Sequence, residues 1–192
     1  MDIKEEFNQI EEKNRELIGK AMGIMKQVTD KKHALSHVES VVNYTKEILR
    51  NVDSADKEVC IISAYWHDVG RSVKQEGHAK LSADMLQTEM KNLGYDEELI
   101  QKCYFAIYKH GWREEPETLE GIIIRDADKI DFAGIGRWKE CIKANCPFSK
   151  ILKLLPTMRK ELLKLECSKQ IFDREIANLV VYLHNQVFKI RQ

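Results

Sequence analysis

The sequence predicts an all-α protein. Apolar residues recur at helical spacings along almost the whole chain. A candidate strand, Ile122-Ile123-Ile124, has little else in the chain to pair with. Glycine and proline, which interrupt helices for steric and hydrogen-bonding reasons, divide the chain into lengths typical of helices. We therefore expect a compact helical bundle with additional helices at both ends.

The two ends of the chain are predicted to be amphipathic helices. Their apolar stripes are Phe7, Ile10, Leu17, Ile18 and Met25 at the start, and Ile176, Leu179, Val180, Leu183 and Val187 at the end. A similar stripe from Val38 to Val52 predicts a helix over 36–52. The terminal stripes either complete the core or form a homodimer interface, and periodicity does not distinguish these uses.

The run from Val59 to Trp66 is apolar on every side, which is typical of a buried central helix or a short buried strand. A helix is the better interpretation, because a strand has few partners here and Ser54 or Asp56 can cap a helix. Further helices are expected over 78–93, 96–110 with Asp96 as its cap, 118–145, 149–166 and 168–191. The expected connections are Gly70 to Gly77, Gly94-Tyr95, Gly111 to Pro116 and Cys146-Pro147.

Composition favours a cytoplasmic, single-domain protein over residues 1–192. Apolar residues make up 43% and charged residues 32%, a mixture typical of soluble globular proteins. Lys plus Arg and Asp plus Glu number 31 each, so we expect no overall attraction to nucleic acid or to an anionic membrane. Five cysteines without a CxxC pair indicate reduced thiols and argue against a structural zinc knuckle. An acidic start and the lack of a long uncharged run predict neither a signal peptide nor a membrane span.

The doublet His67-Asp68 is the strongest indication of chemistry in the chain. It follows the apolar run that ends at Trp66 and precedes Gly70. Burying two titratable side chains at such a place costs free energy unless they share a partner, and a divalent metal ion is a partner for both. The other candidate ligands at helix-associated positions are His37, His78, His110 and Asp128.

Each of these candidates also has a purely structural interpretation. His37 can be a hydrogen-bonded histidine at the edge of the core, and His78 can be an exposed residue at a helix start. His110 suits the C-terminal end of a helix, where the backbone favours a protonated imidazole. Asp128 can belong to a surface ion-pair cluster with Arg125 and Lys129.

Several segments resemble the motifs of the HD-domain superfamily of metal-dependent phosphohydrolases, an all-helical family named for the doublet. They are Ser36-His37-Val38-Glu39-Ser40-Val41-Val42, Ser63-Ala64-Tyr65-Trp66-His67-Asp68-Val69-Gly70-Arg71, Gly77-His78-Ala79-Lys80-Leu81-Ser82-Ala83, Ala106-Ile107-Tyr108-Lys109-His110-Gly111 and Arg125-Asp126-Ala127-Asp128-Lys129-Ile130-Asp131. The resemblance covers about residues 33–138. One departure is Ser40, where family members often carry arginine, so a contact to phosphate or to a carboxylate is either missing or supplied from elsewhere.

The resemblance implies that four residues bind metal: His37, His67, Asp68 and Asp128. Such a mixed nitrogen and oxygen set suits Mn²⁺, Fe²⁺, Co²⁺, Ni²⁺ or Zn²⁺, and Mg²⁺ also stays open. We expect His78 and His110 either to bind a second ion or, preferably, to contact the phosphate of a substrate. Positive charge for that substrate is expected from Arg71, Lys74 or Lys109.

The expected function is hydrolysis of a phosphate ester or anhydride of a small metabolite or nucleotide. Aromatic residues that could stack on a base are Tyr65, Tyr104, Phe105, Tyr108, Trp112 and Trp138, although aromatics at helical spacing more often belong to the core. The main alternative is a regulatory module that keeps the metal and senses a nucleotide without turnover. A helical interaction protein with structural histidines is a third interpretation.

Overall fold

A computed structural model describes residues 2–28, 35–143 and 148–190. Every regular element in these ranges is helical, which confirms the all-α prediction. The α-helices are α1 (Ile3–Lys13), α2 (Arg15–Met25), α3 (Leu35–Leu49), α4 (Lys57–Trp66), α5 (His78–Asn92), α6 (Glu97–Tyr108), α7 (Leu119–Asp131), α8 (Ile135–Lys143), α9 (Phe148–Thr157) and α10 (Glu166–Ile190). A 3-10 turn, η1 (Val69–Ser72), follows α4, and a π turn, η2 (Met158–Leu162), follows α9. The expected connection Cys146-Pro147 lies outside the described residues.

The apolar run forms the central helix α4 rather than a strand. The Asp56 side chain accepts a hydrogen bond from the Val59 N–H at 3.2 Å and so caps the first turn. Helix α4 packs against α1, α2, α3, α6 and α7, and its residues Val59, Cys60, Ile61, Ile62 and Ala64 are fully buried. Complete burial of an aliphatic side chain contributes about 1.5–3 kcal/mol, so α4 is the element on which the core is built. Its C-terminal end carries the doublet, and the core therefore fixes the position of that doublet.

The N-terminal segment, expected as one amphipathic helix, is divided at Asn14. This residue is fully buried, and its amide donates to the Ile10 carbonyl and the Glu58 carboxylate, both at 2.9 Å. Its carbonyl oxygen accepts a hydrogen bond from the Tyr95 hydroxyl at 2.8 Å. The break at Asn14 thus ties the first two helices to α4 and to the start of α6.

The predicted helix over 118–145 is also divided, because α7 ends at Asp131 and α8 begins at Ile135. A Cβ atom added at Gly134 would lie 2.8 Å from the Tyr44 hydroxyl, so glycine lets the turn lie directly against this side chain of α3. The Trp138 indole N–H donates to the Phe132 carbonyl at 2.8 Å and holds the turn closed.

The helix expected over 149–166 ends earlier, with a change to π geometry after Thr157. Pro156 lies inside α9 and has no backbone N–H to donate, which weakens the regular ladder at this point. The chain then turns into α10, and the buried carboxylate of Asp126 accepts hydrogen bonds from the N–H groups of Lys164 and Leu165 at 3.2 and 3.0 Å. Asp126 therefore attaches the start of the last helix to α7.

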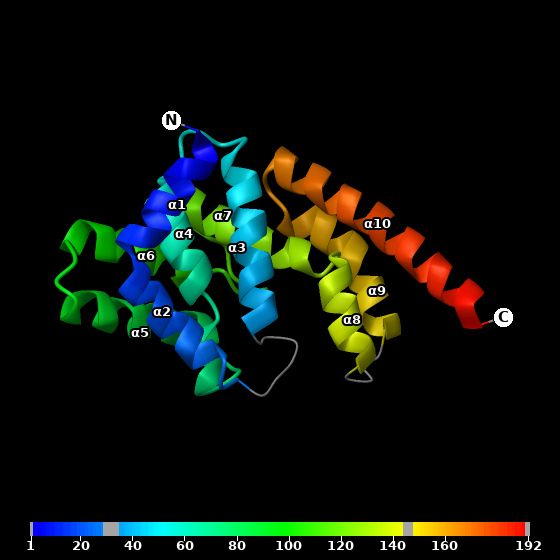
Figure 1. Cartoon of the computed structure of the whole chain (residues 1–192), viewed down its shortest axis with the longest axis horizontal. Coiled ribbons are helices and arrows are strands. Elements are labelled where there is room, and N and C mark those ends of the chain that lie inside the picture. Colours follow the sequence, from blue (N-terminus) through cyan, green and yellow to red (C-terminus); the bar gives the residue numbers. More distant parts are fainter. Residues whose placement is uncertain (1, 29–34, 144–147, 191–192) are drawn as a thin grey trace.

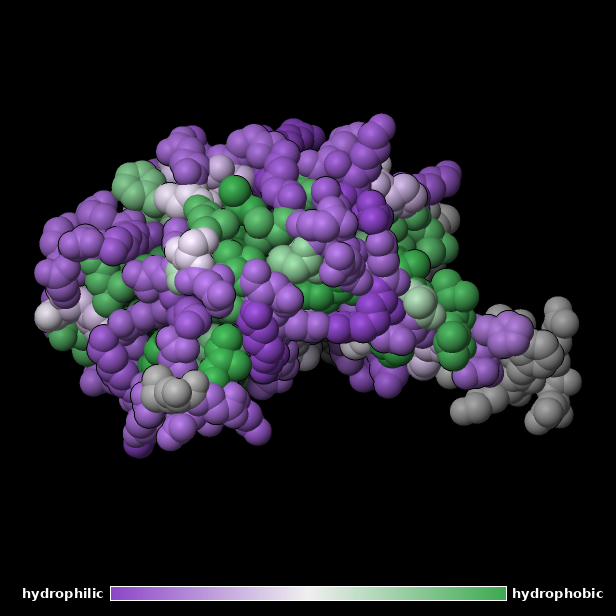
Figure 2. Space-filling model, turned by 90° about the horizontal axis from the view of Figure 1, so that it is seen from above, coloured by the Kyte–Doolittle hydropathy of each residue, from purple (hydrophilic) through white to green (hydrophobic). Residues whose placement is uncertain are grey.

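The helices α8, α9 and α10 lie together at one end of the molecule, and α5 and α6 lie at the other (Figure 1). Exposed aliphatic residues occur on these three C-terminal helices: Ile142, Leu152, Leu154, Val180 and Val181. Polar side chains cover much of the face shown in Figure 2, with apolar patches between them. Within the described ranges no helix combines the length and apolar character that crossing a membrane requires. The homodimer interface stays a prediction.

Candidate metal centre

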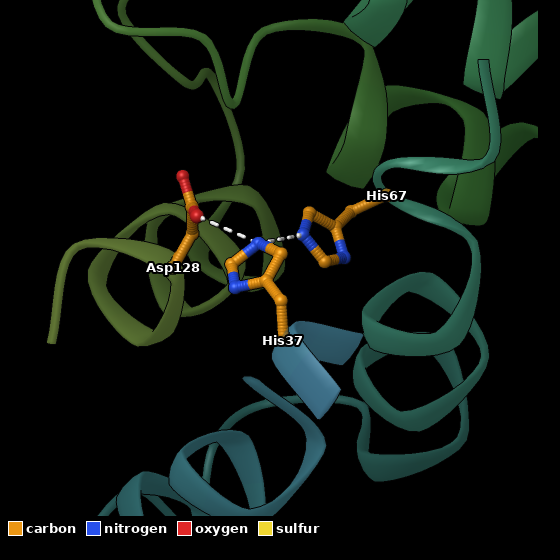
Figure 3. A group of neighbouring side chains, drawn as sticks. All are labelled: His37, His67 and Asp128. Carbon is orange, nitrogen blue, oxygen red and sulfur yellow. Dashed lines mark hydrogen bonds and ion pairs between the residues drawn. The ribbon is translucent and has the colours of Figure 1, made fainter. Parts of the chain in front are cut away.

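Three helices bring the predicted ligands to one place. His37 lies in the first turn of α3, His67 and Asp68 follow the last residue of α4, and Asp128 lies in α7. Figure 3 shows His37, His67 and Asp128 pointing toward one another from these separate segments. The side chains of this cluster are almost completely shielded from solvent, with Asp128 the most exposed at 7%. Convergence of residues 91 positions apart in the sequence is thus a product of the packing of α3 and α7 on α4.

The Nε2 atoms of His37 and His67 face each other at 3.2 Å. His37 Nε2 also lies 3.3 Å from Asp128 Oδ1 and 3.5 Å from Asp68 Oδ2. One ligand atom from each of His37, His67 and Asp128 falls within 4.8 Å of the others, a spacing at which a single ion contacts all three. Asp68 lies at the edge of this group, with its Oδ2 atom 3.8 Å from His67 Nε2.

Three of the histidines present Nε2 to the cluster because Nδ1 is engaged by the backbone. His67 Nδ1 lies 2.8 Å from the Ala64 carbonyl, and His110 Nδ1 lies 2.8 Å from the Ile107 carbonyl. His78 Nδ1 lies 2.9 Å from the Gln75 carbonyl. A carbonyl oxygen only accepts, so Nδ1 carries the hydrogen in each ring and Nε2 keeps a lone pair when the ring is neutral. This arrangement of the second ring nitrogen is typical of metal-binding histidines.

His37 differs because its Nδ1 contacts a carboxylate, that of Asp131, at 2.8 Å. Burial and the charge of Arg137 lower the pKa of His37, but hydrogen bonds to Asp128, Asp131 and Asp68 outweigh them and raise it to about 10. Burial lowers the pKa of His67 to about 3, which makes that imidazole neutral under ordinary conditions. In the metal-free protein a proton on His37 therefore places a further positive charge beside these carboxylates.

The carboxylate of Asp68 joins this group to a second one. Its Oδ1 atom lies 3.2 Å from His78 Nε2 and 3.6 Å from His110 Nε2, and ligand atoms of these three residues also fall within 4.8 Å of one another. Arg71 already contacts this second group, with Nε 2.7 Å from Asp68 Oδ2 and Nη2 3.0 Å from His78 Nε2. The guanidinium thus lies between the two groups: its Nε contacts the Asp68 oxygen that faces the first group, and its Nη2 contacts the ring nitrogen of His78 in the second group.

Close backbone packing places the second group beside the doublet. The Gly70 N–H donates to the Ser82 hydroxyl at 2.8 Å. A Cβ atom added at Gly70 would lie 2.5 Å from the His78 carbonyl oxygen, so this position needs glycine for lack of space. The start of α5, which carries His78, is thereby held against the turn that follows Asp68.

A pocket of about 250 Å³ opens beside both groups. Its walls are formed by Arg71, His78, His110, Gly111, Trp112, Asp128, Lys129 and Phe132. The ammonium of Lys129 pairs with Asp128 and lies 5.7 Å from the centre of the Trp112 ring. The pocket therefore combines the candidate metal ligands, two cationic side chains and an aromatic surface.

Two of the expected substrate-binding residues do not lie on these walls. Lys74 is exposed, and Lys109 pairs with Glu117 at the surface. Arg71 is the member of that set that the structure brings to the pocket. Among the aromatic candidates, Trp112 lines the pocket and is 36% exposed, whereas Trp138 is buried.

The roles of Lys129 and Arg137 were not predicted from the sequence. The interpretation of Arg125, Asp128 and Lys129 as a surface cluster is wrong, because all three are buried. For Lys129 the available signal was its place between Ile124 and Ile130, in a segment of α7 that is buried from Ile123 to Asp131. Charged residues in such a buried segment need partners of opposite charge. A site that binds a metal cation and a phosphate anion provides such partners.

Comparisons with known proteins agree with this arrangement. A family model described as the HD domain matches residues 34–133. A crystal structure of a predicted HD superfamily hydrolase from an uncultured Thermotogales bacterium has a TM-score of 0.68 and 21% identity, with 91% of each chain covered. The crystal structure of Bacillus subtilis YpgQ in complex with ADP has a TM-score of 0.63 and 17% identity, covering 97% of this chain and 95% of that one. Ribonuclease Y from Desulforudis audaxviator is 32% identical over 93 residues, which are 47% of this chain and 17% of that protein.

Proposed function

This chain belongs to the HD-domain family, and we propose that it is a metal-dependent phosphohydrolase that cleaves a phosphate ester or anhydride of a small metabolite or nucleotide. The observation that carries the proposal is the 3.2 Å approach of the Nε2 atoms of His37 and His67. Two nitrogen lone pairs repel at this distance unless a cation or a proton lies between them. With the carboxylates of Asp68 and Asp128 beside them, these nitrogens form a donor set that fits a divalent ion.

When bound, a divalent ion supplies a Lewis acid that lowers the pKa of water toward neutrality and offsets phosphoryl charge. We propose that His37, His67, Asp68 and Asp128 hold a single ion. Arg71 Nη2 lies 3.0 Å from His78 Nε2, the ring nitrogen that a second ion would need, and this supports phosphate contact, rather than a second ion, as the role of that group.

The side chains of the pocket would bind and orient the phosphate. Lys129 and Arg71 line the pocket and provide charge-assisted hydrogen bonds to phosphoryl oxygens. His78 and His110 face the same space with Nε2, where each can hold a proton near the bridging oxygen. The buried position of His110 excludes bulk water from that side of the pocket.

A nucleotide is the substrate class that the pocket supports best. Trp112 presents an aromatic surface next to the cationic side chains, and stacking of a base on an aromatic ring contributes about 1–3 kcal/mol. YpgQ, which has the same fold, was crystallised with ADP. We expect Trp112→Ala to weaken binding of adenosine monophosphate about 5- to 100-fold and to leave binding of ribose 5-phosphate unchanged.

Metal analysis of Asp68→Ala tests the proposal. We expect wild-type protein to bind one Mn²⁺ per chain and Asp68→Ala to lose the ion while keeping its helical content. Asp84→Ala on α5 is a matched control, because that carboxylate pairs with Lys80 at the surface. If Asp68→Ala keeps its metal content and is only less stable, the result would instead support the interpretation that these histidines and carboxylates have a purely structural role. Two ions per chain would assign His78 and His110 to a second ion.

A panel of phosphate compounds with Mn²⁺ separates an enzyme from a sensor. Release of phosphate or pyrophosphate from nucleoside mono-, di- or triphosphates, or from sugar phosphates, is the expected result. Metal and nucleotide binding without release of either product from any compound would support the sensing module.

A further inference from the structure

We propose that Arg137 is a positioning residue for the metal centre, acting through Asp131 on His37. This inference rests on the proposed function. Arg137 lies on α8, beyond the residues 34–133 that match the HD domain, so it is a contribution from outside the matched region. Neither Arg137 nor Asp131 lines the substrate pocket.

The contacts form a continuous chain from α8 to the ligand. Arg137 Nε lies 2.9 Å from Asp131 Oδ2, and the same oxygen lies 2.8 Å from His37 Nδ1. All three side chains are at least 94% buried, so water competes little for these contacts. Arg137 Nη2 also lies 3.2 Å from His37 Nδ1, but a guanidinium only donates and the Asp131 carboxylate is closer, so Nδ1 carries the hydrogen toward Asp131 and Nε2 is directed at the cluster. Loss of such an outer partner typically weakens metal binding by about 10- to 100-fold.

The turn between α7 and α8 fixes the guanidinium. The Arg137 guanidinium carbon lies 4.7 Å from the centre of the Phe132 ring, and the Trp138 indole holds the Phe132 carbonyl at 2.8 Å. Gly134 permits the close approach of this turn to Tyr44. Arg137 therefore reaches Asp131 from a rigid position and not from a mobile side chain at the surface.

A small cavity shows why Asp131 needs this support. It has a volume of about 140 Å³ and adjoins His37, Asp131 and Arg137, with Ser36 and Ser40 on its wall. A carboxylate beside such a space has room to rotate away from the imidazole. The guanidinium, together with a hydrogen bond from the Ser40 side chain, holds it with Oδ2 on His37 Nδ1. Without that hydrogen bond the ring loses the constraint that directs Nε2 at the ion.

The sign of the effect distinguishes positioning from simple electrostatics. Removing a positive charge close to a cation site strengthens cation binding if the charge acts only through space. Removing a positioning group weakens cation binding instead. Replacement of Arg137 by methionine, which keeps most of the apolar stem, therefore gives opposite results under the two explanations.

The experiment measures the Mn²⁺ affinity of each variant by chelator competition. The melting temperature of the same variant without metal is measured beside it, so that a loss of affinity can be told apart from a loss of stability. We expect Arg137→Met to weaken Mn²⁺ binding about tenfold and Asp131→Ala about 10- to 100-fold, with Asp131→Asn intermediate because an amide oxygen still accepts from Nδ1. Lys139→Met is the matched control: it removes a positive charge from the wall of the same cavity without touching Asp131, and its affinity should stay the same or rise slightly.

Unchanged or tighter Mn²⁺ binding in Arg137→Met would overturn the inference, even if the variant melts at a lower temperature. A wild-type protein that binds no divalent ion would overturn the proposed function and this inference together. Wild-type binding with unaffected Arg137→Met binding would overturn only the inference.

Discussion

Replacing Gly70 by alanine tests how far the metal centre depends on close backbone packing. The added Cβ atom would lie 2.5 Å from the His78 carbonyl oxygen and 2.8 Å from the Ser82 backbone nitrogen. Both atoms belong to α5, so the helix has to move away by roughly half an ångström or more. Overpacking of this kind costs about 1–3 kcal/mol, and weakening the hydrogen bond from the Gly70 N–H to the Ser82 hydroxyl costs about 1 kcal/mol more.

The expected result is a melting temperature lower by about 5–15 °C, since 1 kcal/mol corresponds to about 2–4 °C at this chain length. Because the turn carrying Asp68 moves with Gly70, Mn²⁺ affinity should fall as well. Gly19→Ala is the control: a Cβ atom there meets nothing within 4 Å, so the same change on the exposed face of α2 should stabilise the protein by about 0.5–1 kcal/mol. Differential scanning calorimetry of both variants gives the comparison. A Gly70→Ala protein with wild-type melting temperature and metal affinity would refute the argument from space.

Three further predictions concern a proton, a cation and a buried amide. With a pKa raised to about 10, His37 holds a proton that Mn²⁺ has to displace, so the Mn²⁺ affinity should rise about tenfold per pH unit from pH 6.5 to 8. Calorimetry in buffers of different ionisation enthalpy should detect close to one proton released per bound ion. Release of no proton would contradict this role of His37. Lys129→Met should lower kcat/KM for a phosphate substrate about 10- to 100-fold without weakening Mn²⁺ binding, because Lys129 pairs with Asp128 and lines the pocket. Unchanged kcat/KM would show that Lys129 does not bind the substrate. Asn14→Ala removes a fully buried amide and leaves the half-buried Tyr95 hydroxyl without its acceptor, so it should destabilise the protein by about 2–3 kcal/mol in urea unfolding. A change below about 0.5 kcal/mol would show that the break in the N-terminal helix does not need the amide.

The helices and the central place of α4 were predictable because they depend on local patterns. Apolar periodicity and the caps Asp56 and Asp96 mark where helices lie and begin. The breaks at Asn14 and Gly134 were not predictable, since each depends on a partner far away in sequence, Glu58 in one case and Tyr44 in the other. That residues 1–192 form one domain, and that the protein is cytoplasmic, remain predictions.

The candidate ligands were found through short sequence motifs, such as the doublet His67-Asp68. The sequence carries no distances, so it did not reveal that Asp68 lies between two histidine groups or that Lys109 forms an ion pair with Glu117. Arg137 gave no signal because it follows the last motif and reaches His37 across 100 positions. Packing of α8 against the end of α7 creates that contact, and no local pattern encodes it.

The pairing of acids with bases around the cluster determines the net charge that the cluster presents to a phosphate group. The pairs are Asp68 with Arg71, Asp128 with Lys129, and Asp131 with Arg137. Since each carboxylate is matched by one cation, these six side chains sum to zero charge, and a divalent ion together with a neutral His37 would leave the cluster at +2. A phosphate monoester dianion cancels this charge, and so does inorganic phosphate in its dianionic form. The product of the proposed reaction should therefore compete with the substrate for the same pocket and inhibit turnover as it accumulates.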